Sequence, residues 1–349
     1  EEYDRDSTFP RDVINKAWEL GLMNTSIPEE YGGPALDYLS GSIIEEQLSW
    51  GCSGIATSIF TNGLASAPVE LGGSEETKKK YLTQLVEEPK LASFCLTEPD
   101  AGSDVASMKT TAVKNGDKYV LNGSKCFITN GSHADWFTVY AKTDPDAGHR
   151  GISAFVVEKE WGVVVDKKED KLGMRASETV EVLLQGCRIP AENLIGEEGM
   201  GFIYLMQNLP QERLSIAIMA AAAMEAVLDE TLQYVKERKA FGKPIGSFQN
   251  SRFLLAELAT EATAVRIMTD EFIRLHLDEK LTADQAAMAK WWTTEAQVKL
   301  IDRCLQLHGG YGYMREYNVA RAFLDARVQT IYGGTTEIRK EIIGRSLGV

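Results

Sequence analysis

The amino-acid sequence predicts an α+β protein in which helices and strands occupy separate stretches of the chain. Apolar residues recur at helical spacing in residues 1–91 and again in residues 201–349, whereas short alternating runs dominate residues 92–200. An alternating α/β fold would interleave the two patterns along the whole chain. Because 349 residues suffice for two or three domains, we expect an N-terminal helical domain, a middle β domain and a C-terminal helical domain with these bounds.

The N-terminal zone has three amphipathic segments separated by glycine and proline breakers at residues 31–34 and 72–73. These segments predict helices at residues 10–22, 41–50 and 77–86. The sequence begins at Glu1 without a methionine, so we expect an N-terminal piece, including the first helix of this domain, to be absent. No targeting signal can be read.

In the middle zone, the dipeptides Asn115-Gly116 and Asn122-Gly123 are strong signals for hairpin turns. They separate expected strands at residues 110–113, 118–121 and 125–129, and further strands are expected at 136–141, 152–157 and 180–184. After Gly201 the periodicity is helical almost to the end. It predicts helices at residues 202–238, 248–278, 282–308 and 318–326.

Composition and charge exclude several classes of function. A net charge of −14 disfavours binding to nucleic acid or to an anionic membrane, and no apolar run approaches the roughly 18 residues of a membrane-spanning helix. The four histidines form no metal-binding motif, and the five cysteines contain no C-x-x-C pair. We therefore expect no metal, no disulfide framework and a soluble protein of a reducing compartment, either a bacterial cytoplasm or a mitochondrial matrix.

Five ordered motifs extend over nearly the whole chain. The first reads Thr-Glu-Pro-Asp-Ala-Gly-Ser-Asp at residues 97–104, and the others lie at 125–131, 237–242, 306–312 and 332–335. In these motifs the chain resembles the acyl-CoA dehydrogenase family, most closely its long-chain type. The resemblance implies a middle β-barrel or sandwich domain, a C-terminal four-helix bundle and FAD bound in the groove between them. It also implies a homotetramer and an electron-transferring flavoprotein as the partner that receives the electrons.

The resemblance also implies which residues contact FAD. Around the flavin ring and the thioester end of the substrate it places Phe94, Leu96, Thr97, Ser103, Phe127 and Thr129, and near the cofactor also Thr335 and Glu337. On the FAD phosphates and adenosine, across a subunit boundary, it places Arg238, Ala240, Phe241, Gln249, Gln306 and Gly310. An arginine supported by backbone donors can hold a pyrophosphate even in an acidic protein. The plain alternative for Arg238 is a solvated charge at a helix end.

The expected catalytic base is Glu212. Dehydrogenation next to a thioester needs a carboxylate that removes a proton. In many family members this carboxylate follows the C-terminal tyrosine, where this chain has Gly333. In the long-chain and isovaleryl types it is instead the glutamate before an arginine on the helix after the β domain, which corresponds to Glu212 and Arg213. Gly333 keeps the N–H that polarises the thioester carbonyl in the family. The plain alternative for Glu212 is a surface or ion-paired helix residue.

The remaining expectations concern the substrate. By similarity the acyl-CoA site is lined by Ser103, Tyr204, Pro210, Gln211, Arg213, Gly333 and Gly334. The two glycines are expected to leave volume for a long chain or for a branch near the reacting carbons. The expected reaction converts a medium- or long-chain acyl-CoA to its trans-2-enoyl-CoA. The alternatives are a branched-chain (isovaleryl-like) dehydrogenase, an oxygen-using relative such as an acyl-CoA oxidase or a flavin monooxygenase, and a catalytically silent protein that binds FAD or acyl-CoA.

Overall fold

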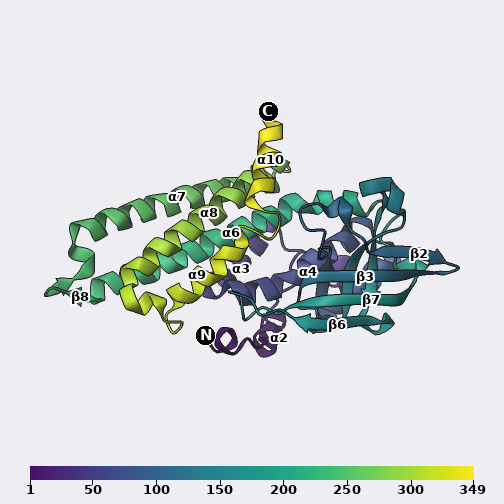
Figure 1. Cartoon of the computed structure of the whole chain (residues 1–349), viewed down its shortest axis with the longest axis horizontal. Helices are drawn as coiled ribbons and strands as arrows, with labels where there is room; N and C mark the ends of the chain where they lie inside the picture. Colours follow the sequence, from purple (N-terminus) through teal and green to yellow (C-terminus); the bar gives the residue numbers. More distant parts are fainter.

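The sheet and the long C-terminal helices occupy opposite ends of an elongated molecule, and the N-terminal helices lie between and beneath them (Figure 1). This arrangement comes from a computed structural model that describes all of residues 1–349. It has N-terminal helices, a middle curled β-sheet and a C-terminal helical domain, which confirms the predicted α+β class. None of the helices combines the length and the apolar character needed to cross a bilayer.

Five helices form the N-terminal part: α1 (Glu2–Asp6), α2 (Arg11–Glu19), α3 (Tyr38–Gly51), α4 (Ser53–Gly72) and α5 (Glu75–Glu87). Three of them lie where amphipathic spacing predicts a helix. The sequence did not reveal α4, because this helix is buried on most sides and has no apolar stripe to detect. It packs on the sheet, where the Thr138 hydroxyl donates to the Ala65 carbonyl at 2.6 Å.

The middle part is one seven-stranded sheet with the order β1-β4-β2-β3-β7-β6 and with β5 paired to β4. Only the β1–β4 and β2–β4 pairs are parallel. The strands are β1 (Ala92–Cys95), β2 (Thr111–Asn115), β3 (Lys118–Thr129), β4 (Trp136–Lys142), β5 (Ile152–Glu158), β6 (Val163–Lys168) and β7 (Thr179–Pro190). Both faces are covered, because one apolar cluster joins the sheet to α4 and α5 while a second fills its other side.

One of the two predicted hairpin turns is present and the other is wrong. Asn115-Gly116 closes the antiparallel β2–β3 hairpin, and Gly116 has the positive φ of +64° that such a turn requires. Asn122-Gly123 instead lies inside β3, at a register shift in its pairing with β7. A Cβ on Gly123 would lie 2.3 Å from the Thr110 Oγ1 atom, so close packing and not a turn explains this glycine.

The C-terminal part consists of three long helices and two short ones. These are α6 (Gly201–Glu237), α7 (Gln249–Leu277), α8 (Ala283–His308), α9 (Asn318–Gln329) and α10 (Thr336–Ser346). Helix α6 runs through Pro210 without ending, and α8 begins with a capping box between Thr282 and Gln285. Helix α10, which the sequence pattern did not indicate, stands out from the bundle (Figure 1). The turn between α9 and α10 carries Gly333 and Gly334.

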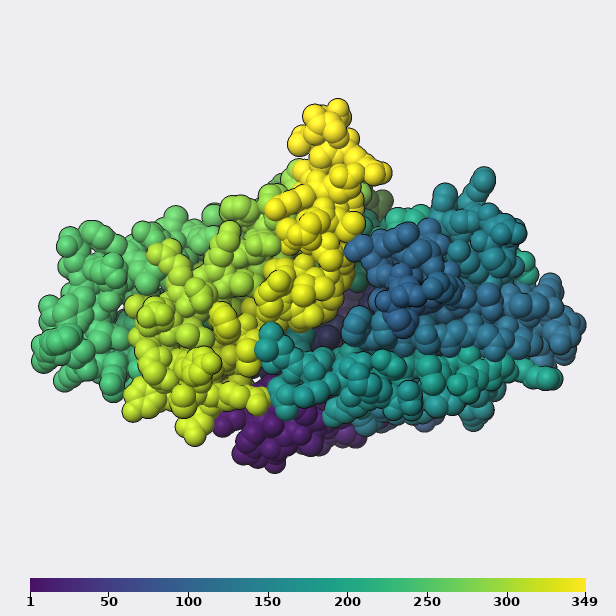
Figure 2. Space-filling model, in the orientation of Figure 1, coloured from purple at the N-terminus to yellow at the C-terminus, as the bar shows by residue number.

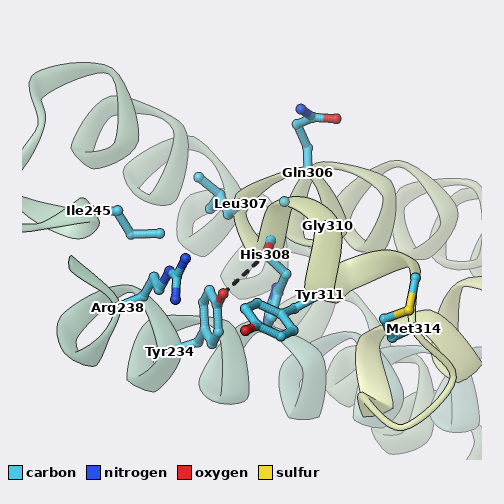
Figure 3. Close-up of a pocket in the computed structure, with 10 residues that line it drawn as sticks. Tyr234, Arg238, Ile245, Gln306, Leu307, His308, Gly310, Tyr311 and Met314 are labelled. Atoms are coloured by element: carbon cyan, nitrogen blue, oxygen red, sulfur yellow. Dashed lines mark hydrogen bonds between the residues drawn. The ribbon is translucent and has the colours of Figure 1, made fainter. Parts of the chain in front are cut away.

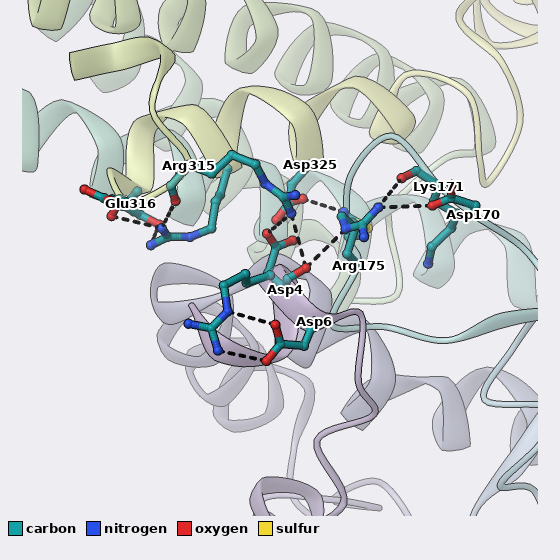
Figure 4. Close-up of polar contacts among 12 residues, drawn as sticks. Asp4, Asp6, Asp170, Lys171, Arg175, Arg315, Glu316 and Asp325 are labelled. Atoms are coloured by element: carbon teal, nitrogen blue, oxygen red, sulfur yellow. Dashed lines mark hydrogen bonds and ion pairs between the residues drawn. The ribbon is translucent and has the colours of Figure 1, made fainter. Parts of the chain in front are cut away.

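A polar network joins the three parts of the chain around α9 (Figure 4). Asp4 in α1 pairs with Arg315 at 2.7 Å, and its carbonyl accepts from Arg175 in the segment before β7. Asp325 in α9 accepts from the Met174 backbone N–H. These bonds fix α9 against both the sheet and the N-terminal helices, and thus position the turn that follows α9.

Candidate active site

Glu212 and Gly333 face each other across the interface between α6 and the α9–α10 turn. A Cβ built on Gly333 would lie 3.6 Å from Glu212 Oε1 and 2.2 Å from Ile216 Cδ1. The Glu212 carboxylate thus lies beside the position from which a side chain at residue 333 would project. Glu212 is partly buried and makes no hydrogen bond or ion pair, so it is free to accept a proton.

Burial and three neighbouring cations act in opposite directions on the pKa of Glu212. Burial raises the pKa of the Glu212 carboxyl above its ordinary value, and the neighbouring cations Arg213, Arg339 and Lys290 oppose this rise. A partly buried carboxylate with a perturbed pKa is typical of a group that exchanges protons during catalysis. The electrostatics therefore agree with a base and not with a solvated surface residue.

The Gly333-Gly334 turn has a backbone that favours glycine at both positions. Their φ angles are +58° and +89°, in the left-handed region. The Gly333 N–H donates to no group of the chain, whereas the Gly334 carbonyl accepts from Lys290 Nζ at 2.8 Å. Thr335 then caps α10 by accepting from the Ile338 N–H. The turn therefore offers one free amide donor on a fixed backbone.

The expectation that the two glycines enlarge the acyl cavity is wrong. The space beside Gly333 is filled by the end of Ile216, and a Cβ on Gly334 would lie 1.9 Å from Arg339 Nη2. Both positions favour glycine because their φ angles are positive, and another side chain occupies the space beside each α-carbon. Neither glycine leaves a void that an acyl chain could enter.

A buried ion pair holds the loop that follows β1. Lys125 Nζ donates to Glu98 at 2.8 Å and to the Leu96 carbonyl at 3.0 Å. Glu98 also accepts from the backbone N–H groups of Lys109 and Thr110, so both of its oxygens are bonded. Such a fully bonded buried pair fixes the loop that contains Leu96 and Thr97.

A bulge in β3 brings Phe127 and Thr129 to the same edge. The β3–β7 register shifts between Lys125 and Ile128, and Phe127 has a φ of +59° with 67% of its surface exposed. The Cys126 N–H donates to the Thr97 carbonyl at 2.9 Å and so ties the bulge to the loop. The predicted ring-contacting residues Thr97, Phe127 and Thr129 are therefore neighbours. A bulge is the local device that turns a ring out of a sheet.

The edge of the sheet is connected to Glu212 through two aromatic rings. Phe94 in β1 is half-buried, and its ring centroid lies 5.2 Å from that of Tyr140 in β4. Burial raises the pKa of the Tyr140 phenol, and the nearby Glu212 charge raises it further. Phe94, one of the predicted cofactor residues, therefore packs on a buried tyrosine that lies within the electrostatic reach of Glu212.

A second group of predicted cofactor residues lines a pocket at the other end of the C-terminal helices (Figure 3). Arg238, Gln306 and Gly310 belong to its lining, and the cavity has a volume of about 560 Å³. The Arg238 guanidinium lies 5.4 Å from the centroid of the Tyr311 ring and pairs with no carboxylate. An unpaired arginine in a pocket of an acidic protein suits a ligand that carries phosphate.

Ala240, Phe241 and Gln249 lie near this pocket, on the hairpin of β8 (Lys239–Ala240) and β9 (Lys243–Pro244) and at the start of α7. Phe241 is 96% exposed, with a φ of +50°. Glu212 and Arg238 lie roughly 39 Å apart along α6 at the helical rise per residue. One chain therefore does not bring the two groups of predicted cofactor residues together.

The other predicted substrate and cofactor residues have mixed surroundings. The Tyr204 ring packs against Gly72 and Gly196, where an added Cβ would collide with it. Arg213 is buried and its Nε has no partner, so it lies between helices and not on an open surface. Three other predicted site residues are exposed, namely Ser103, Gln211 and Glu337. Pro210 is partly buried.

Two pairs of buried charges near the site were not expected from the sequence. Glu98 and Lys125 form the ion pair described above, and Lys290 and Arg339 contact the Gly333-Gly334 turn. Lys290 follows an alanine-rich apolar run on α8. A lysine on an apolar helix face is unusual, and this feature of the sequence could have indicated a buried charge. Arg339 left no signal, because the sequence pattern did not indicate α10.

The donors of the site fit FAD. Phe127 offers an exposed ring face, the Gly333 N–H is free, and Arg238 is an unpaired cation in a pocket. Phe127 would hold a flat ring system and Arg238 a pyrophosphate, which leaves the Gly333 N–H for a substrate carbonyl. The chain contains no group of histidines, cysteines and carboxylates that could hold a metal ion.

Three family profiles match the chain in order. They describe the acyl-CoA dehydrogenase N-terminal domain at residues 1–89, the middle domain at 93–187 and the C-terminal domain at 199–348. Together they extend over nearly all of the sequence. They match the same three stretches that the change from helical to alternating apolar spacing separates.

Individual relatives agree with these profiles. The long-chain specific acyl-CoA dehydrogenase of Sus scrofa mitochondria is 42% identical over 99% of this chain and 81% of its own length. The crystal structure of acyl-CoA dehydrogenase from Geobacillus kaustophilus is 42% identical, with a TM-score of 0.95 over 100% of this chain and 92% of that one. A chain from a study of the electron transferring flavoprotein of Acidaminococcus fermentans is 39% identical, with a TM-score of 0.96 over 99% and 92%.

Proposed function

The chain belongs to the acyl-CoA dehydrogenase family, and we propose that Glu212, in place of a residue at position 333, removes the substrate proton. It is an FAD-dependent oxidoreductase that dehydrogenates acyl-CoA at the α,β carbon–carbon bond. One observation supports the assignment of the base above all others. The Glu212 carboxylate lies 3.6 Å from the position that a Cβ on Gly333 would occupy. A base on α6 can therefore reach the same region as a side chain at position 333 would.

In this proposal each residue of the site has a separate role in the reaction. Glu212 takes the proton from the carbon next to the thioester, since it is an unpaired carboxylate in a partly desolvated position. The free Gly333 N–H donates to the thioester carbonyl, where negative charge develops as the proton leaves. Phe127 and Thr129 would hold the ring of the cofactor. FAD, when bound, accepts the β-hydrogen together with its electron pair.

We propose a medium- or long-chain acyl-CoA as the substrate. The support is the glycine at position 333 combined with the glutamate at 212, and the similarity to the long-chain specific enzyme of Sus scrofa. A branched-chain acyl-CoA is the second candidate, because isovaleryl-type enzymes resemble this chain in the same exchange. A series of straight and branched acyl-CoAs, assayed with an artificial electron acceptor, distinguishes the two. A maximum of kcat/KM for a short branched acyl group would favour the second candidate.

We also propose that FAD is shared between subunits of a homotetramer. The support is the roughly 39 Å between Glu212 and Arg238 along α6, which exceeds the length of one extended FAD molecule. The group around Arg238 would then hold the phosphate end of a cofactor whose ring lies in another subunit. An electron-transferring flavoprotein is the proposed electron acceptor, supported by the likeness to the chain from the Acidaminococcus fermentans study. Rapid formation of hydrogen peroxide on turnover would indicate an oxygen-using enzyme instead.

The test of the proposed base is the variant Glu212→Gln. This change removes the basic carboxylate and keeps the size and polarity of the side chain. We expect the variant to retain FAD and to bind acyl-CoA, measured as a shift in the flavin absorption spectrum. Its flavin should then fail to bleach when acyl-CoA is added without oxygen. Normal bleaching would reject Glu212 as the base, and absence of bleaching in the unaltered protein would indicate a silent binding protein.

A further inference from the structure

Two buried cations from outside Glu212's own helix contact the Gly333-Gly334 turn. Lys290 in α8 is fully buried, and its Nζ donates to the Gly334 carbonyl at 2.8 Å. Arg339 in α10 is 3% exposed, and its Nη2 lies 1.9 Å from where a Gly334 Cβ would be, so the guanidinium packs directly on this glycine. Neither cation forms an ion pair. Two unpaired buried cations at one turn are costly for folding and therefore require an explanation.

The bond from Lys290 restricts the orientation of the turn. The Gly334 carbonyl belongs to the peptide unit that follows the one between Gly333 and Gly334, and both glycines have positive φ angles. Glycine has the widest conformational freedom of all residues, so this turn would have several orientations without an external bond. Lys290 Nζ is the only side-chain donor that bonds to its backbone. It therefore limits the direction in which the free Gly333 N–H points.

Arg339 acts mainly through charge. Its Nε and Nη1 atoms are buried and have no hydrogen-bond partner. Together with Arg213 and Lys290 it opposes the rise in the pKa of Glu212 that burial causes. A buried guanidinium without a bonded carboxylate contributes to the electrostatic potential around the nearest anion. That anion is Glu212, since Arg339 has Glu212 as its favourable charged neighbour.

We propose that Lys290 and Arg339 are positioning residues of the reaction: Lys290 orients the Gly333 amide toward the thioester carbonyl, and the two cations together keep Glu212 ionised. This rests on the proposed function for the role of Glu212. The orientation of the amide does not depend on which carboxylate is the base. The two parts of the proposal therefore have separate measurements.

The pH dependence follows from all the charged groups around this site. Glu212 faces Arg213 on α6, Lys290 on α8 and Arg339 on α10, and the phenols of Tyr140 and Tyr332 also lie within its field. Around Lys290, burial and the two arginines lower the pKa to about 7, while Glu212 and Glu295 raise it. Lys290 is therefore charged below about pH 7 and neutral above it. Loss of the Lys290 charge should therefore change kcat/KM only on the acidic side of its pH profile.

The test compares Lys290→Met with Lys290→Gln, Arg339→Met and Arg339→Lys in the FAD-loaded enzyme. Lys290→Met removes both the donor and the charge, whereas Lys290→Gln keeps a donor, and Arg339→Lys keeps the charge. An opposite charge nearby shifts a carboxyl pKa by about one unit or more. We therefore expect the acidic limb of the kcat/KM profile to move up by about one pH unit in Lys290→Met, Lys290→Gln and Arg339→Met. Arg339→Lys should restore the limb, and Lys299→Met, an exposed lysine of the same helix, should leave it unchanged.

The orientation of the amide is read from the flavin spectrum. Binding of a non-reactive acyl-CoA thioether perturbs the flavin absorption, and a thioester analogue that uses the Gly333 N–H should perturb it further. We expect Lys290→Met to lose this additional perturbation and Lys290→Gln to retain it. An unshifted acidic limb with an unchanged spectrum in Lys290→Met overturns the proposal, even if the melting temperature falls. If Glu212→Gln bleaches normally, the base assignment fails while the spectral result still decides the role of Lys290.

Discussion

At the scale of single residues, the active site depends on an exchange between positions 212 and 333. The carboxylate at Glu212 lies beside the Cβ position of Gly333, and Ile216 fills the rest of that space. A side chain at 333 would therefore compete with Ile216 and would require a left-handed backbone. Glycine at 333 and glutamate at 212 thus occupy adjacent positions in one arrangement.

This dependence predicts the effect of Gly333→Ala. The new methyl group would lie 2.2 Å from Ile216 Cδ1 and would have to adopt a φ of +58°. The left-handed conformation costs about 1–2 kcal/mol, and displacement of the Gly333 N–H should lower kcat/KM between about 10-fold and 10²-fold. Steady-state kinetics measure this effect. The double variant Gly333→Ala with Ile216→Val should recover part of the loss, and an unchanged kcat/KM in the single variant would contradict the account.

The sequence motifs pointed to these two positions but not to the side chains that pack against them. Glu212 stands next to an arginine in a recognisable motif, and the free N–H at Gly333 follows from its place in the last motif. The packing of Ile216 and Arg339 against the two glycines depends on where helices α6 and α10 cross the turn. No local pattern encodes such a contact, and the expected extra volume was wrong for this reason.

At the scale of elements, α9 is held in place by a buried acid. Burial raises the pKa of Asp325 to about 6, although the Met174 N–H bonded to it lowers the pKa. Because the pKa in the folded state lies above that of an unfolded aspartate, this carboxyl favours folding below the unfolded pKa, near 3.9. That contribution is lost as the pH rises through about 6, where the buried group ionises.

The prediction is that Asp325→Asn stabilises the protein at high pH. Asparagine keeps an oxygen that can accept from the Met174 N–H, and it has no charge to bury. We expect the melting temperature of the variant to exceed that of the unaltered protein at pH 8 and the difference to shrink toward pH 4. Thermal unfolding at a series of pH values measures this. A variant that is less stable at pH 8 would show that the charge of Asp325 is needed by its basic neighbours Lys171 and Arg321.

The prediction of elements from sequence succeeded for several helices with one exposed face, although β6 and α10, which are also partly exposed, were not expected. Helices α3, α5, α7 and α8 have polar and apolar sides and were expected within a few residues of their observed ends. Helix α4 is buried almost all round, and β3 runs through an Asn-Gly pair that usually marks a turn. In both cases tertiary packing decides the structure, and a local pattern cannot report it.

At the scale of the whole molecule, the net charge of −14 must be reconciled with a cofactor that carries two phosphates. Arg238 offers an unpaired guanidinium in the pocket at the far end of α6 (Figure 3). The surface at that end also exposes large apolar groups, among them Phe241 and Tyr313. Figure 2 shows this end as the part of the molecule farthest from the sheet. A second subunit covering it would bury the aromatic groups and complete the cofactor site.

This account predicts that Arg238→Ala weakens FAD binding without disturbing Glu212. Hydrogen bonds to charged groups contribute about 1.5–3 kcal/mol, so FAD affinity should fall by roughly 10-fold to 10²-fold. The ratio of flavin to protein absorbance after gel filtration measures the loss, and light scattering reports the number of subunits. The neighbouring variant Lys236→Ala, which changes an exposed lysine outside the pocket, should keep its flavin. Full flavin content in Arg238→Ala would remove Arg238 from the cofactor site.

The most direct measurement of the central claim is the rate of flavin bleaching in a single turnover without oxygen. It compares the unaltered protein with Glu212→Gln and with a swap in which Gln211→Glu is combined with Glu212→Gln. A positioned base contributes about 10²- to 10⁴-fold, so Glu212→Gln should slow bleaching by at least the lower figure. The swap should remain slow, because moving the carboxylate by one residue turns it about 100° around α6, away from Gly333. Bleaching of Glu212→Gln at the rate of the unaltered protein would contradict the claim that the base lies at position 212.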